Sequence, residues 1–136
     1  MANIDSFLNK KYILVSSENL EEYLKETGIN MLMRQLAKKM SPEIELTRFE
    51  DEYTFTSVTT LTSTVLKFKL GVEFEKQTPD GQVVRSVFTT DGCVLTEVQT
   101  DSMGRVTTIE RTFSDDQVTA VIKLNDVVAK TYYKLK

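Results

Sequence analysis

The chain has 136 residues, a net charge of −3 and no histidine, and its length lies in the usual range of one compact domain. The acidic balance argues against nucleic-acid binding, which needs a basic face that neutralises phosphates. The lack of histidine removes the commonest general base and metal ligand, and the single cysteine, Cys93, permits no internal disulfide. We therefore expect one domain over residues 1–136 with no metal, no cofactor and no catalytic activity.

The first segments of the chain change from a strand pattern to a helix pattern. Residues 11–15 (Lys-Tyr-Ile-Leu-Val) are β-branched and aromatic, which predicts a strand. Asn19 and Glu22 then have the spacing of a helix capping box. Leu20 and Leu24 are four residues apart and share one helix face. The pattern predicts a short helix directly after the first strand.

Gly28 ends this helix, and a second helical pattern follows with its apolar residues on one face: Ile29, Leu32, Met33 and Leu36. Pro42 closes the segment, because the residue before a proline avoids the helical conformation. Three basic residues lie off the apolar face: Arg34, Lys38 and Lys39. They indicate a solvated helix face or, alternatively, a transient contact with anionic membrane surfaces.

From Glu43 onward the hydrophobic period is two. Short runs rich in Val, Thr, Phe and Tyr alternate with turn residues about every 8 to 12 positions, which predicts an antiparallel meander. Tight turns between neighbouring strands favour an up-and-down barrel, a fold without exposed edges. The predicted turns are at residues 50–52, 79–81, 91–92, 101–104, 114–116 and 125–126.

Arg111 is the most informative polar residue. Near residues 106–113, alternation puts three polar residues on one strand face and places Arg111 with Ile109 and Phe113 on the other. A buried guanidinium needs a partner, because burying it unpaired is costly. Three interpretations remain open: an internal Asp or Glu, an edge strand with another face assignment, or an exogenous carboxylate inside the barrel.

The last strand pattern, residues 127–136, contains Lys130 and Tyr132 on one face. A cation and a phenol together would suit a carboxylate. The opposite face, with Ala129, Thr131 and Tyr133, is nearly as apolar. Alternation alone does not decide which face points inward, and Lys130 also fits a solvated strand cation.

Several stretches, taken in order, give the chain a resemblance to the intracellular lipid-binding proteins, which include fatty-acid-binding and cellular retinoic-acid-binding proteins. Residues 63–75 (Ser-Thr-Val-Leu-Lys-Phe-Lys-Leu-Gly-Val-Glu-Phe-Glu) are similar to the central block of that family. The other similar stretches are residues 10–14, 19–24, 33–37 with Pro42, 80–87, 107–111 and 130–132. The resemblance covers essentially the whole chain.

The resemblance implies an all-β fold of the calycin or lipocalin-like type: a ten-stranded up-and-down antiparallel barrel with a two-helix lid between the first two strands. It implies an intracellular, cytoplasmic, monomeric carrier that binds a long-chain fatty acid. The family's carboxylate clamp carries over as Arg111, Lys130 and Tyr132, with Lys130 standing where most acid-binding members have arginine. Retinoic acid, another carboxylate with an apolar tail, is the alternative ligand.

The resemblance also implies which residues line the cavity and its portal. These are Leu20, Leu24, Ile29, Leu61, Asp80 and Ile109. Leu61 stands where many members have a phenylalanine, so the contacts with the ligand's tail do not carry over directly.

Overall fold

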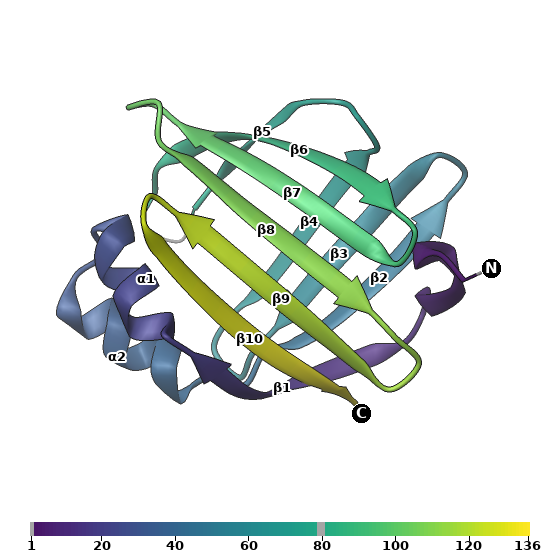
Figure 1. Ribbon diagram of the computed structural model, residues 1–136, viewed down its shortest axis with the longest axis horizontal. Helices are drawn as coiled ribbons and strands as arrows, with labels where there is room; N and C mark the ends of the chain where they lie inside the picture. The colour runs from purple at the N-terminus through teal and green to yellow at the C-terminus, as the bar shows by residue number, and fades with distance from the viewer. Residues whose placement is uncertain (1, 79–80) are drawn as a thin grey trace.

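In residues 2–78 and 81–136, which this computed structural model describes, ten strands form one antiparallel sheet that curls into a barrel (Figure 1). The strands are β1 (Lys11–Glu18), β2 (Glu43–Phe49), β3 (Glu52–Val58), β4 (Ser63–Lys69), β5 (Phe74–Gln77), β6 (Val83–Asp91), β7 (Val94–Asp101), β8 (Val106–Phe113), β9 (Gln117–Leu124) and β10 (Val127–Leu135). A 3₁₀ helix, η1 (Ile4–Phe7), precedes them, and α1 (Leu20–Thr27) and α2 (Met31–Lys39) lie between β1 and β2. The predicted barrel with a helical pair between its first two strands is confirmed.

The sheet order runs β4-β3-β2-β1-β10-β9-β8-β7-β6-β5. β4 and β5 therefore end the order, and other contacts bring this side of the barrel together. The Gly71 amide donates to the carbonyl of Phe88 at 2.8 Å, and the rings of Phe68 and Phe88 stack with centroids 3.9 Å apart. One backbone bond and an aromatic stack thus span the seam that the strand ladder leaves.

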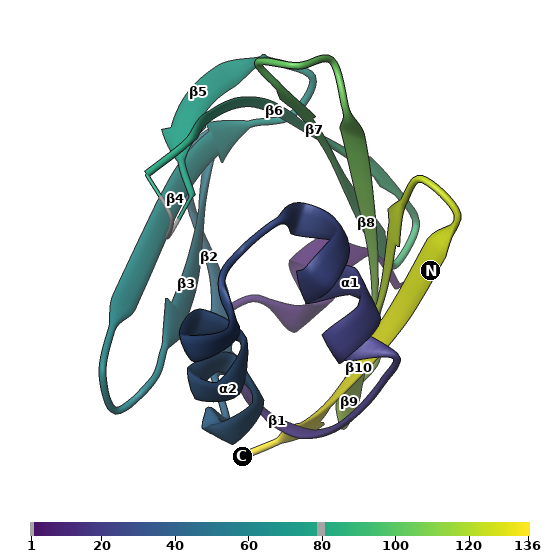
Figure 2. The ribbon, with the colours of Figure 1, turned by 90° about the vertical axis from the view of Figure 1, so that its left-hand side faces the viewer.

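Helices α1 and α2 lie across one end of the barrel (Figure 2). α1 ends at Gly28, whose positive φ of 87° suits glycine. Its last turn is fastened to the barrel rim, because Arg105 donates to the Glu26 carbonyl at 3.1 Å and Asn125 donates to the Glu26 carboxylate at 2.7 Å. Neither helix is long and apolar enough to cross a membrane, among the residues described.

α1 begins where the sequence predicts, but the predicted capping box is wrong. Asn19 has the left-handed conformation (φ 58°, ψ 22°) and its side chain makes no capping bond. Its amide instead donates to the Val128 carbonyl on β10 at 3.0 Å, which fixes the start of the lid to the barrel wall. In α2 the capping residue is Asn30, whose side chain accepts from the Met33 amide at 2.9 Å.

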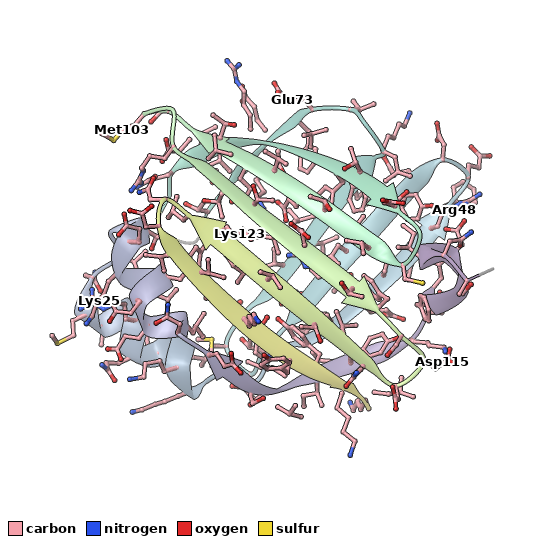
Figure 3. All side chains as sticks on the ribbon, in the orientation of Figure 1. Lys25, Arg48, Glu73, Met103, Asp115 and Lys123 are labelled. Carbon is pink, nitrogen blue, oxygen red and sulfur yellow. The ribbon has the colours of Figure 1, made fainter. Side chains whose placement is uncertain are left out.

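The opposite end of the barrel is closed by η1. Ile4 and Phe7 are buried in the core, and the Phe7 ring stacks on Phe113. Between them, Asp5 accepts from Arg48 at 2.7 Å and from the Tyr53 hydroxyl at 2.8 Å. Arg48, labelled in Figure 3, lies beside η1, so this end is held by apolar packing and a balanced ion pair.

Candidate functional site

Arg111 lies on the inner face of β8. Its neighbours on that face, Ile109 and Phe113, are 8% and 3% exposed, and the Arg111 side chain is 13% exposed. The inward direction predicted for Arg111 and Ile109 is confirmed. An arginine is thus held among apolar residues inside the barrel.

The partner of Arg111 is Glu97 on the neighbouring strand β7. Arg111 Nη1 donates to Glu97 Oε1 at 3.2 Å. The other oxygen, Oε2, accepts from Lys76 Nζ at 2.6 Å, from Ser86 Oγ at 2.8 Å and from Gln99 Nε2 at 2.8 Å. Of the interpretations that the sequence left open, the internal acid is therefore present.

Glu97 is ionised although it has no exposed surface. Burial alone would raise the pKa of its carboxyl, but the charges of Arg111 and Lys76 and the bonds from Lys76 and Ser86 lower that pKa to about 2. A buried carboxylate is tolerated when it is paired and hydrogen-bonded. We define Arg111, Lys76, Glu97, Ser86 and Gln99 as the inner polar cluster.

Arg111 retains unused hydrogen-bonding capacity. Its guanidinium lies over the Phe55 ring, 4.5 Å from the centroid, and Glu97 is its only hydrogen-bond partner within the described part of the chain. A guanidinium has several further N–H donors. Arg111 therefore has N–H groups that no described residue uses.

The wall next to Arg111 offers two free hydroxyls. Register puts Arg111 opposite Ala120 on β9, and Ala120 opposite Thr131 on β10. Thr131 is 5% exposed, and Tyr133, two residues on, packs against the core. Neither hydroxyl has a hydrogen-bond partner among residues 2–78 and 81–136.

The predicted inward direction of Lys130 and Tyr132 is wrong. Lys130 is exposed, and the Tyr132 hydroxyl donates to Glu18 at 3.0 Å on the exposed outer face. The physical reason is strand parity: Ala129 and Thr131 are buried at 0% and 5% exposure, and Tyr133 packs against the core. The alternate residues Lys130 and Tyr132 therefore point outward. The inward cation expected on β10 is replaced by Thr131, and the inward phenol is Tyr133.

The lid contributes another phenol. Burial raises the pKa of Tyr23 on α1, and the Glu97 carboxylate raises it further while Arg111 lowers it. The Tyr23 hydroxyl therefore lies within electrostatic range of Glu97 and Arg111. Its hydroxyl makes no hydrogen bond within the described residues.

The predicted portal residues fall at the helix end. Leu20, Leu24 and Ile29 are half-buried on the lid, while Leu61 in the loop between β3 and β4 is 66% exposed. The predicted portal residue Asp80 lies outside the described residues. The apolar lid residues Leu20, Leu24 and Ile29 therefore lie at the helix-covered end of the barrel.

A hollow of about 400 Å³ also opens at this end. It is lined by Ser17, Asn19, Leu20, Glu21, Glu22 and Lys38. Two carboxylates face its single lysine, and Lys38 is already paired with Glu21 at 3.2 Å. This rim hollow is therefore a poor anion site.

Comparison with known proteins decides the family. Residues 10–135 match the Lipocalin / cytosolic fatty-acid binding protein family. The chain belongs to this family. A muscle fatty-acid-binding protein of Schistocerca gregaria is 39% identical, with 96% of this chain and 98% of that protein covered. A fatty-acid-binding protein of Tyrophagus putrescentiae is 38% identical, with coverage of 93% and 96%.

A solved structure adds a ligand to the comparison. The fatty-acid-binding protein of Schistosoma mansoni in complex with arachidonic acid superposes with a TM-score of 0.92 at 29% identity, covering 99% of both chains. The resemblance seen in the sequence is thus confirmed at the level of family and fold. The sequence analysis singled out Arg111 but missed the other residues of the inner polar cluster: Lys76, Ser86, Glu97 and Gln99. Glu97 and Lys76 were missed because neither lies in a stretch whose two faces differ clearly in polarity.

Proposed function

We propose that this protein is a non-catalytic carrier that binds one long-chain fatty acid inside its barrel, with the carboxylate held by Arg111. The observation that supports this most directly is an inward arginine whose guanidinium has unused N–H donors, beside two hydroxyls, of Thr131 and Tyr133; none of these groups has a further hydrogen-bond partner among the described residues. An arginine fork matches a carboxylate in shape and charge. The relatives named as fatty-acid-binding proteins support the same ligand class.

The proposed head-group contacts differ from those expected from the sequence. Tyr133 takes the place of Tyr132 as the phenol that donates to the carboxylate. Thr131 takes the inward position expected for Lys130 and supplies a hydroxyl instead of a charge. Ile109 and the lid residues Leu20, Leu24 and Ile29 would contact the apolar tail, with Leu61 at the portal.

Calorimetric titration with oleate at neutral pH tests the proposal. We expect saturable binding of about one oleate per chain, together with displacement of a fluorescent fatty-acid probe. No heat and no displacement would contradict it. Retinoic acid presents the same carboxylate, so competition between retinoic acid and oleate, followed by retinoid absorbance, tells the two ligand classes apart.

The remaining features of the proposal concern where and how the carrier works. We place it in the cytoplasm as a monomeric single domain, in keeping with the name of its family. The apolar residues Met31 and Leu32 on α2 are 66% and 69% exposed, and Lys38 and Lys39 lie in the last turn of the same helix. We propose that this helix makes transient contact with anionic membranes during ligand transfer.

Arg34 contributes less to that contact than its charge suggests. It is half-buried, and its guanidinium donates to the Ile29 carbonyl at 2.8 Å within the lid. Lys39 is exposed and has no ion-pair partner among the described residues. Lys39 is therefore the basic residue of α2 best placed to meet a lipid head group.

A further inference from the structure

Glu97 has no part in the carboxylate contacts proposed above, yet it is at the centre of the inner polar cluster. It is a permanent negative charge inside a barrel proposed to hold an anion. Among the described residues, its Oε2 accepts from three donors at 2.6 to 2.8 Å, whereas its Oε1 accepts only from Arg111, at 3.2 Å. Glu97 is thus anchored by β5, β6 and its own strand, and Arg111 is the looser of its partners.

The cluster has an uneven charge. Lys76 and Arg111 are two cations, their side chains 15% and 13% exposed, and Glu97 is the one carboxylate between them. Among the described residues, the ion pairs at the two ends of the barrel are balanced: Asp101 with Arg105 beside the lid, and the more exposed pair of Asp5 with Arg48 beside η1. Within the described part of the chain, the inner polar cluster therefore carries one uncompensated positive charge.

An uncompensated charge in a partly buried site favours ligands whose own charge neutralises it. A singly charged head group neutralises it, whereas a doubly charged one would leave a net negative charge in a region of low dielectric. A neutral head group would leave the positive charge unpaired. The count of charges, and not only the shape of the site, therefore discriminates among lipids.

We propose that Glu97 is the residue that sets head-group specificity: by cancelling one of two internal cations it makes the barrel select singly charged lipid anions over doubly charged ones such as phosphate monoesters. The inference rests on the proposed function, because it concerns the same anion site. Lys76 is its counterpart, since Lys76 both supplies the second cation and anchors Glu97.

Two probe ligands isolate charge from shape. Oleyl sulfate and oleyl phosphate share one tail and a tetrahedral head group of similar size, but above the second phosphate pKa of about 6 the phosphate carries two charges and the sulfate one. Affinities for both, and for oleate, are measured at pH 8 by displacement of a fluorescent fatty-acid probe. For each variant we compare the ratio of oleyl phosphate affinity to oleyl sulfate affinity. A substitution that weakens the binding of both ligands equally leaves this ratio unchanged.

Three variants change the internal charge in known steps. Glu97→Gln raises it by one, Lys76→Met lowers it by one, and the double variant Lys76→Met/Glu97→Gln restores the wild-type charge with neither group present. We expect wild type to favour sulfate, and Glu97→Gln to raise the phosphate-to-sulfate ratio by about tenfold or more, as one additional charge at close range allows. Lys76→Met should lower the ratio, and the double variant should return it near the wild-type value.

The outcomes separate this inference from the proposed function. Equal changes in both affinities in Glu97→Gln, or a double variant that keeps the Glu97→Gln ratio, would overturn the charge rule while oleate binding stands. Wild type that binds neither oleate nor oleyl sulfate would overturn the proposed function itself. If Glu97→Gln does not fold, Lys76→Met tests the charge rule instead. In that variant Glu97 still has Arg111, Ser86 and Gln99 as hydrogen-bond partners, so the site should persist. The phosphate-to-sulfate affinity ratio must then fall, and an unchanged ratio would overturn the charge rule.

Discussion

Arg111 and Glu97 lie on neighbouring strands and meet through one hydrogen bond, from Nη1 to Oε1 at 3.2 Å. Because three other groups hold Glu97, this bond orients Arg111 and leaves its other N–H groups available. A lone buried guanidinium would be costly. Glu97 therefore lets the protein keep a charged arginine inside the barrel.

The first prediction concerns Arg111→Gln. We expect the variant to bind oleate more weakly by about 1.5 to 3 kcal/mol, the usual contribution of a hydrogen bond to a charged group. The free energy of unfolding should fall less than for a typical broken buried pair, because Glu97 keeps the Lys76 ammonium and two neutral donors. Calorimetry and urea unfolding measure the two quantities on the same protein.

Arg85→Gln is the matched control, because Arg85 lies on the exposed outer face of β6 with its side chain 68% exposed. It should change neither quantity noticeably. An Arg111→Gln variant that binds oleate as tightly as wild type but unfolds much more readily would make Arg111 a structural member of the inner polar cluster and not a ligand contact.

The second prediction concerns acid. Burial opposes ionisation of Glu97, but Arg111 and Lys76 lower its pKa from 4.5 to about 2. A lowered pKa contributes stability that is present above the unfolded-state pKa and is lost as the pH falls toward the folded-state pKa. Between about pH 5 and pH 2, this group alone should remove on the order of 3 kcal/mol from the free energy of unfolding.

Unfolding of wild type and Glu97→Gln in urea at several pH values across that window tests the linkage. The variant should be less stable at neutral pH, with a shallower decline on acidification. Glu110→Gln, a loss of one carboxylate from the outer face of β8, is the control and should follow wild type. Parallel pH curves for wild type and Glu97→Gln would contradict a strongly lowered pKa.

The third prediction concerns the lid helix and membranes. Each basic residue close to an anionic bilayer contributes about 1 kcal/mol, so Lys39→Glu should lower affinity for phosphatidylserine vesicles by about fivefold or more. Binding should also weaken as salt is added. Lys134→Glu makes the same charge reversal on exposed β10 and should leave vesicle binding close to wild type, whereas equal losses in both variants would point to net charge instead of the lid.

Much of the fold could be predicted because its signals are local. Period-two patterns and turn residues predicted the meander, and turns do lie at residues 50–51, 92–93 and 125–126. The loops at residues 59–62 and 70–73 were not predicted, because their composition resembles that of the strands. The first is rich in Thr, and the second has Leu and Val beside its glycine. The Asn19 cap failed because a tertiary bond to Val128 replaced the local one.

The site was harder to predict because alternation does not say which face is inside. Arg111 could be assigned, since its strand has one polar and one apolar face. On β10 both faces are apolar enough to point into the barrel, so the sequence does not distinguish them. The burial of Ala129 and Thr131 in the structure shows which face points inward. The ion pair of Glu97 with Lys76 joins residues 21 positions apart, a contact that no local pattern predicts.

The last prediction uses the two adjacent tyrosines of β10, which point to opposite sides of the barrel wall. Tyr133→Phe removes an inner hydroxyl that has no partner among the described residues, so we expect oleate affinity to fall by about 1.5 kcal/mol, near one hydrogen bond to a charged group. Tyr132→Phe removes an outer hydroxyl that is bound to Glu18, and it should leave oleate affinity unchanged. Lys130→Ala, on the same outer face, should also leave oleate affinity unchanged, because a side chain on the far side of the sheet cannot reach the ligand.

Calorimetric titration of the three variants against wild type compares the two faces directly, with circular dichroism to confirm that each variant is folded. Loss of affinity in Tyr132→Phe or Lys130→Ala, with Tyr133→Phe unaffected, would reverse the assignment of faces on β10 and restore the clamp of Lys130 and Tyr132.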